Sequence, residues 1–233
     1  MKIAASQKER YLRACPLFDG LDPEVITRMA TRARSVALGK GEALFHEGDP
    51  SDGLYVLCSG LVQVSIADAD GNTLVLALPE RGAPLGEMTL VTPDPRSATV
   101  SALEDSTLLH IKTVTMVALL AEEPALARHL IAFLSRRLRQ LNDSLHRFAF
   151  DNLQRRLLQK LTELGLQHGS LRPEGLSLGR KFSQTALAEM LGVTREAINK
   201  QLKLLQDQGD IAIETGVIRL CHPAEIVKNS PNL

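Results

Sequence analysis

FSQTALAEMLGVTREAINKQLKLLQDQGDI, residues 182–211, has the pattern of two short helices joined by a tight turn. Ser183 and Thr194 stand where the two helices would begin, and a hydroxyl there accepts a hydrogen bond from a free backbone N–H group. Gly192 lies at the turn, where a left-handed backbone conformation costs glycine least. Ala188 is small enough for the two helices to pass close to each other. The stretch therefore predicts a helix-turn-helix.

The second helix of this pair has one apolar stripe and one polar face. Ile198, Leu202 and Leu205 recur at helical spacing and predict the buried stripe. The polar face matches base edges, because arginine and lysine suit guanine, glutamate suits cytosine and asparagine suits adenine. We therefore predict DNA binding through the major groove, with a solvated helical hairpin as the alternative. The residues expected to contact DNA are Arg195, Glu196, Asn199 and Lys200, with Ser183, Gln184 and Thr185 at the start of the first helix.

The bulk properties of the chain are those of a globular protein. Its 233 residues are enough for two domains. The longest apolar run is far short of a membrane span and the N-terminus lacks a signal-peptide core, so a cytoplasmic protein is expected. Cys15, Cys58 and Cys221 are widely separated without metal-ligand spacing, which predicts buried or idle thiols. The formal net charge is zero, so attraction to DNA phosphates has to be local.

Residues 35–111 have a different sequence pattern from the rest of the chain. Short β-rich runs are separated by turns that contain glycine, and Asp70-Gly71 is a strong hairpin signal. This pattern predicts a compact antiparallel β-roll or jelly roll. The expected strands are Ala43–Phe45, 54–57, 61–66, Thr73–Ala77, 98–102 and 107–111.

One turn of this β domain, LGEMTLVTPDPRSATV at residues 85–100, carries candidate ligand-binding groups. Its GEM triplet predicts a single short helix whose first backbone N–H groups attract anions. The guanidinium of Arg96 and the hydroxyl of Ser97 add donors, which together make a phosphate cradle. The carboxylate of Glu87 would repel a phosphate, but it can accept a hydrogen bond from a sugar hydroxyl. The alternative is an ordinary surface ion pair between Arg96 and Glu87 that closes the loop.

A long helix is expected after Pro124. Its apolar residues are spaced 3, 4, 3, 4 and 3 apart, which is a heptad seam. Charged residues fill the other faces, so a two-stranded homodimer is favoured over a helix packed only on its own domain, which would have a broader stripe. The seam consists of Ile131, Leu134, Leu138, Leu141, Leu145 and Phe148.

The remainder of the chain completes a second domain. We expect a hinge at 148–152, a helix at 153–166 ended by Gly165, and a polar loop at 168–180. Two short strands, Ile211–Glu214 and Val217–Leu220, flank Thr215-Gly216 and predict the hairpin of a winged helix.

The glycine-punctuated β domain, the GEMTL…RSA cassette, the long helix and the C-terminal helix-turn-helix together resemble the CRP/FNR family of bacterial transcription regulators. The cyclic AMP receptor branch is the most similar, and the match extends from about residue 17 to residue 220. The resemblance implies an α+β protein in three parts. These are a cyclic-nucleotide-binding-like β-roll domain at 1–123, a dimerisation helix at 124–150 and a winged helix-turn-helix domain at 151–233.

The resemblance also implies roles for the cassette residues. In the family, the cassette glutamate binds the ribose 2′-hydroxyl, and the arginine and serine bind the cyclic phosphate. By motif these roles fall on Glu87, Arg96 and Ser97, with backbone contacts near Gly86 and Met88.

The base-binding part of the site matches the family only in part. The family's threonine-serine pair that contacts adenine falls on Leu141 and Asn142, of which Asn142 alone can hydrogen-bond to a purine. A cyclic nucleotide is the implied effector, with cyclic AMP (cAMP) favoured over cyclic GMP. Another anionic effector and an inherited but unused pocket are the alternatives.

The partners implied by the resemblance are double-stranded DNA and RNA polymerase. Arg195, Glu196 and Lys200 fall on the family's three base-reading positions, and a dimer predicts a palindromic operator with half-site centres about 34 Å apart. Gln184 and Thr185 would contact phosphates. The 168–180 loop becomes a candidate polymerase-contact surface, with a plain solvated loop as the alternative.

Two other functions fit the sequence less well. A redox- or haem-gated member of the same superfamily would need a cysteine cluster or patterned histidine ligands. An enzyme acting on nucleotides would need paired carboxylates, an activated nucleophile or a metal cluster, and none has usable spacing. We therefore expect a regulator that is not an enzyme and has no metal site and no covalent cofactor.

Overall fold

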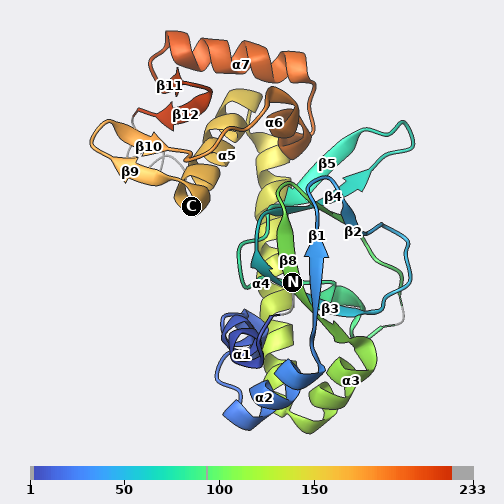
Figure 1. Cartoon of the computed structure of the whole chain (residues 1–233). Helices are drawn as coiled ribbons and strands as arrows, with labels where there is room; N and C mark the ends of the chain where they lie inside the picture. Colours follow the sequence, from blue (N-terminus) through green and yellow to red (C-terminus); the bar gives the residue numbers. More distant parts are fainter. Residues whose placement is uncertain (1–2, 93, 222–233) are drawn as a thin grey trace. The chain divides into compact units, whose positions relative to one another are not determined.

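The computed structural model describes residues 3–92 and 94–221, and the chain forms two compact units (Figure 1). The first unit comprises Met1–Asp68 and Val75–Leu138, and the second comprises Ala69–Leu74 and Arg139–Leu233. The division passes through helix α4 (Pro124–Phe150), so this helix contributes to both units. Within the described residues, no helix is both long enough and apolar enough to span a lipid bilayer.

Helices pack against the β domain of the first unit. The N-terminal segment forms α1 (Ala5–Arg13), the short 3-10 helix η1 (Pro16–Phe18) and α2 (Pro23–Arg32), and α3 (Thr113–Glu122) follows the last strand. These helices pack on one apolar core with the first turns of α4, where Leu126 and Leu130 are buried.

The strands β1 to β8, which apart from the start of β5 belong to the first unit, form two antiparallel sheets with the orders β1-β8-β3-β6 and β2-β7-β4-β5. This confirms the predicted antiparallel β-roll and each of its six predicted strands to within about two residues. The sequence pattern missed β1, which continues a charged segment, and β6, which has only two residues. The strands are β1 (Arg34–Leu38), β2 (Ala43–Phe45), β3 (Gly53–Ser59), β4 (Val62–Ala67), β5 (Thr73–Ala77), β6 (Pro84–Leu85), β7 (Thr99–Ala102) and β8 (Ser106–Lys112).

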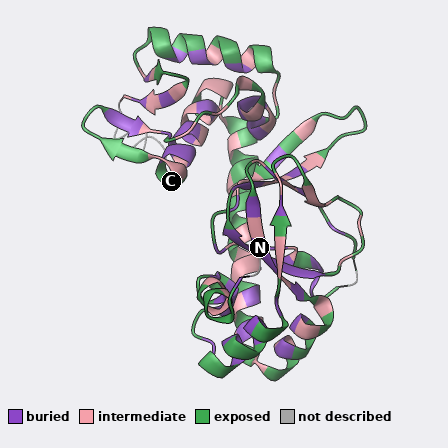
Figure 2. Cartoon of the chain, in the orientation of Figure 1, coloured by how far each residue is buried: buried purple, intermediate pink, exposed green. Residues whose placement is uncertain are grey.

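Burial alternates along β7 because neighbouring side chains point to opposite faces of a sheet, whereas β3 is buried along all but its last residue (Figure 2). In β7, Val100 and Ala102 are buried, whereas Thr99 and Ser101 are only half-buried. A second apolar cluster that includes Leu57, Leu85 and Leu108 lies beside the cassette residues. The cassette therefore runs between β6 and β7, next to this cluster.

The second unit contains α5 (Leu153–His168), α6 (Gln184–Leu191), α7 (Arg195–Asp207) and a four-stranded sheet of order β11-β12-β10-β9. The predicted wing hairpin is confirmed, since β11 (Ile211–Glu214) pairs with β12 (Val217–Leu220). Residues 222–233, the end of the domain expected at 151–233, lie outside the described residues.

Two predictions for this unit were wrong. Gly165 does not end α5; it is buried within the helix, and a Cβ there would lie 2.8 Å from the side chain of Leu176. The glycine therefore serves close packing. The expected polar loop at 168–180 instead contains β9 (Ser170–Arg172) and β10 (Gly175–Ser177), and β10 extends the wing sheet by pairing with β12.

Candidate effector site and DNA-reading surface

The helix-turn-helix forms as its local sequence signals predict. The hydroxyl of Ser183 accepts a hydrogen bond from the backbone N–H of Ala186 at 3.0 Å, which caps α6. The hydroxyl of Thr194 caps α7 in the same way, accepting from the backbone N–H of Ala197 at 3.2 Å. Gly192 ends α6 in the left-handed conformation, with φ of +62°. The caps and the glycine together fix how α7 leaves the turn.

The face of α7 that was expected to read DNA is exposed. Ile198, Leu202 and Leu205 are buried, which leaves the opposite side of the helix to solvent. Gln184, at the first position of α6, accepts a hydrogen bond from Nε of Arg195 at 3.4 Å and donates to Oδ1 of Asn199 at 3.1 Å. The exposed polar residues of this face are Arg195, Glu196, Asn199 and Lys200. Their DNA contacts stay predictions.

The cassette begins where β6 ends. Gly86 has φ of +77° and leads into the 3-10 helix η2 (Glu87–Thr89), which confirms the expected short helix. A Cβ at Gly86 would lie 2.0 Å from Nη1 of Arg96. Glycine is therefore needed here both for the left-handed backbone and for the space that the arginine occupies.

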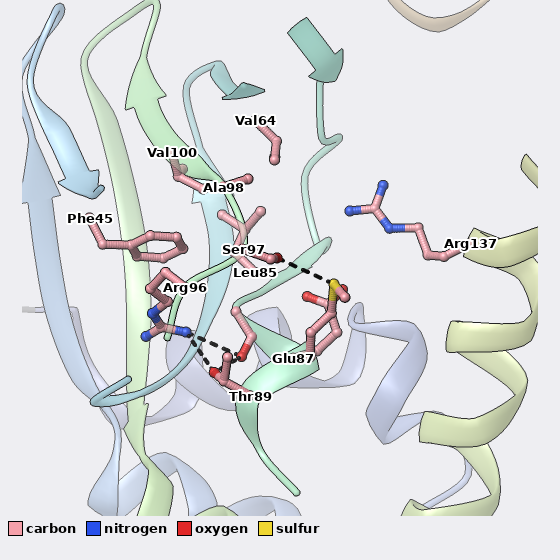
Figure 3. A pocket seen from close by; sticks show the side chains of 12 residues that line it. Phe45, Val64, Leu85, Glu87, Thr89, Arg96, Ser97, Ala98, Val100 and Arg137 are labelled. Atoms are coloured by element: carbon pink, nitrogen blue, oxygen red, sulfur yellow. Dashed lines mark hydrogen bonds between the residues drawn. The ribbon is translucent and has the colours of Figure 1, made fainter. Parts of the chain in front are cut away.

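Arg96 is only 3% exposed, and protein acceptors surround its guanidinium (Figure 3). Nη1 donates to the carbonyl of Gly86 at 3.2 Å and to Oγ1 of Thr89 at 3.3 Å. Nη2 donates to Oδ1 of Asp52 at 2.7 Å and to the carbonyl of Gly53 at 2.8 Å. Arginine has five N–H donors, and the buried Nε is the one nitrogen of Arg96 that has no hydrogen-bond partner among the described residues.

The ion pair expected as an alternative, between Arg96 and Glu87, was wrong: Arg96 pairs with Asp52 instead. Asp52 also accepts from the hydroxyl of Tyr55 at 2.7 Å and lies 3.4 Å from Nε2 of His110. Burial by itself would raise the pKa of Asp52, but the Tyr55 hydrogen bond and the nearby His110 and Arg96 outweigh it and lower that pKa. The carboxylate is therefore charged at neutral pH and neutralises Arg96.

Glu87 is buried although it carries a carboxyl group. Burial raises its pKa, which a backbone hydrogen bond, Arg137 and Arg96 offset in part. Arg137 extends from α4 toward the cassette in Figure 3 and lines the same cavity. No sequence pattern distinguishes Arg137 from its neighbour Arg136, so this cavity residue was missed.

The cavity at the cassette has a volume of about 50 Å³. It brings together five of the six residues expected to hold the effector: Gly86, Glu87, Met88, Arg96 and Ser97. Ser97 is exposed, and its hydroxyl donates to the sulfur of Met88 at 3.5 Å. Asn142, the sixth, is exposed on the part of α4 that belongs to the second unit and is not among the lining residues.

The raised pKa of Glu87 leads to a first prediction. Below the ordinary glutamate pKa of 4.5 the carboxyl group is neutral in both the folded and the unfolded chain. Folding then buries no charge, and the free energy of unfolding carries no penalty from Glu87. Above its raised folded pKa it is charged in both states, and the buried charge lowers the free energy of unfolding. Glu87→Gln is therefore expected to raise the melting temperature of the ligand-free protein at pH 8, with a gain that fades toward pH 4.

Thermal unfolding followed by circular dichroism across that pH range measures this effect. The matched control is Glu80→Gln, at an exposed glutamate, which should change the melting temperature little at any pH. A gain for Glu87→Gln that is equal at pH 4 and pH 8 would show that the buried charge is not its cause.

Comparison with known proteins agrees with this architecture. Residues 35–123 match the model of the cyclic nucleotide-binding domain, and residues 155–227 match the Crp-like helix-turn-helix domain. A cyclic AMP receptor protein of Thermus thermophilus is 30% identical over 209 residues, which cover 90% of this chain and 94% of that protein. A CRP-like cAMP-activated global transcriptional regulator of Mycobacterium tuberculosis is 25% identical over 206 residues, 88% of this chain and 92% of its own.

A comparison with solved structures finds proteins of the same fold. The c-di-GMP responsive global regulator CLP of Xanthomonas campestris matches with a TM-score of 0.75 and 25% identity, over 85% of this chain and 99% of that one. A β-roll for cyclic nucleotides joined to a helix-turn-helix defines a class of DNA-binding regulators. This chain belongs to the CRP/FNR family of transcription regulators.

Proposed function

We propose that this regulator is a homodimer whose binding to a palindromic operator is controlled by a cyclic nucleotide, cyclic AMP before cyclic GMP. The observation that carries the proposal is the cassette. Gly86 makes room for Arg96, and Glu87, Ser97 and Arg137 line the same cavity. Arginine and hydroxyl donors suit a cyclic phosphate, and a carboxylate suits a ribose hydroxyl.

The dimer is supported by the exposed seam of α4. Leu138 is 60% exposed, Leu141 53%, Leu145 58% and Phe148 65%, which is a large apolar surface for a soluble helix. Leu134, also expected in the seam, packs partly against the core of its own unit. The first turns of α4 therefore pack on the core of their own unit. The later turns present an exposed a/d stripe that a second copy of the chain can cover.

The size of the cavity sets a condition on effector binding. At about 50 Å³ it is much smaller than typical ligand pockets, which are roughly 300–1,000 Å³. We therefore expect a nucleotide to open the cassette, with its phosphate using the unpartnered Nε of Arg96 or displacing one of the protein acceptors of this side chain. The effector then favours the opened state, which shifts the population of the regulator.

A calorimetric titration tests the effector directly. We expect cyclic AMP to bind more tightly than cyclic GMP, and 5′-AMP not to bind, because its open phosphate lacks the cyclic geometry. Cyclic di-GMP is a necessary fourth ligand, since a relative of similar fold is responsive to it. Binding of cyclic di-GMP alone would replace the cyclic mononucleotide as effector without affecting the DNA assignment.

The proposed reading helix gives a prediction of its own. Arg195→Ala is expected to weaken binding to the preferred operator by about 1–3 kcal/mol and to relax the preference at a single base pair, because a bidentate contact to guanine is lost. Fluorescence anisotropy with operators changed one base pair at a time measures this. An equal loss on every sequence would assign Arg195 to the phosphate backbone instead.

A contact with RNA polymerase is also proposed, on the family resemblance alone. The hairpin of β9 and β10 presents Leu171, 75% exposed, on the surface of the second unit. An alanine substitution at Leu171 that keeps operator binding and changes transcription in vitro would support this surface.

A further inference from the structure

Gln184 lies between two residues that were expected to read DNA. It occupies the first position of α6, whereas Arg195 and Asn199 come from the first and second turns of α7. Its amide oxygen accepts from Nε of Arg195 at 3.4 Å, and its amide nitrogen donates to Oδ1 of Asn199 at 3.1 Å. A single side chain thus connects both residues across the helix-turn-helix.

The orientation of this network follows from the chemistry of arginine. A guanidinium has only donors, so the oxygen of the Gln184 amide has to face Arg195. The amide nitrogen of Gln184 then faces Asn199 and requires an acceptor, which fixes the Asn199 amide with its oxygen toward Gln184. The hydrogens on the Asn199 nitrogen are left for DNA.

The network also determines which part of Arg195 is presented. Because Nε is bound to Gln184, the two terminal nitrogens remain as a fork at the end of the side chain. That fork is the group that pairs with O6 and N7 of guanine. Because Gln184 holds this fork in place before DNA binds, the Arg195 side chain loses less conformational entropy on binding.

We propose that Gln184 is a positioning residue for base recognition and acts through Arg195 and Asn199. This differs from the phosphate contact expected from the sequence, and it rests on the proposed DNA-binding function. A phosphate contact affects all sequences equally, whereas a positioning residue affects the choice of base at the positions that its partners read.

The test uses the full-length protein and operators selected from a random DNA library, each then changed one base pair at a time. We expect Gln184→Ala to reduce discrimination about 3–10-fold at the base pairs assigned to Arg195 and Asn199, with affinity for random-sequence DNA unchanged. Gln184→Glu keeps an acceptor for Arg195. It should therefore restore discrimination at the Arg195 base pair, although its charge weakens binding to every DNA.

Two controls separate positioning from other roles. Thr185→Ala, at the next residue of α6, should lower affinity equally on all operators if it contacts phosphate. The double variant Gln184→Ala/Arg195→Ala should discriminate no worse at the Arg195 base pair than Arg195→Ala alone, because Gln184 acts there only through Arg195.

The outcomes are distinguishable. A uniform loss of affinity for Gln184→Ala, or no change in base preference, would overturn the positioning role and leave the regulator's DNA binding intact. If the wild-type protein selects no sequence from the library, either with or without saturating cyclic AMP, the proposed function fails and the role of Gln184 fails with it.

Discussion

Replacing Arg96 by alanine is expected to remove the response to cyclic nucleotide and also to destabilise the ligand-free protein by about 2–3 kcal/mol. The first effect follows from losing the proposed donor for the phosphate. The second follows from the structure, because Arg96 gives four hydrogen bonds, to Gly86, Thr89, Asp52 and Gly53, and packs 4.2 Å from the ring centre of Phe45.

Calorimetry and thermal unfolding measure the two effects separately. A loss of about 2–3 kcal/mol corresponds to a fall in melting temperature of roughly 5–10 °C for a chain of this size. Arg96→Lys is the matched control, since it keeps the charge near Asp52 but loses the planar fork and with it most of the hydrogen bonds. If Arg96→Ala binds the nucleotide as tightly as the wild-type protein, Arg96 is not part of the effector site. An unchanged free energy of unfolding would contradict its structural role.

The second large effect is expected at the α4 seam. Leu138→Glu places two carboxylates at facing a positions of the proposed dimer and removes the burial of two leucines, each worth about 1.5–3 kcal/mol. The dimer dissociation constant should therefore rise by roughly two to four orders of magnitude. Operator affinity should fall with it, because one subunit then reads only one half-site.

Sedimentation equilibrium measures the dissociation constant directly. Arg139→Glu is the matched control: it reverses a charge one residue away, at an exposed position off the seam, and should change dimerisation little. If Leu138→Glu and Arg139→Glu dimerise equally well, α4 is not the interface.

The features that the sequence predicted well depend on near neighbours. The caps Ser183 and Thr194, the turn glycine Gly192 and the wing turn at Thr215 are set by residues within a few positions of one another. Such contacts form wherever the local pattern occurs, so the pattern is sufficient to predict them.

The features that were missed depend on distant parts of the chain. Asp52 binds Arg96 across 44 positions, and no local pattern indicates which acid will reach the cassette. Gly165 had the appearance of a helix terminator, but its role depends on Leu176 in another element. Arg137 differs from Arg136 only in the direction it takes from α4, which requires the packing of that helix to be known.

The most direct test of the central claim is the affinity of the wild-type protein for a selected symmetric operator, measured by fluorescence anisotropy with and without saturating cyclic AMP. Coupling between sites is typically about 1–3 kcal/mol, so the nucleotide should change the affinity about 5–150-fold, and Arg96→Ala should lose this change. An operator affinity that is the same with and without cyclic AMP would contradict the account.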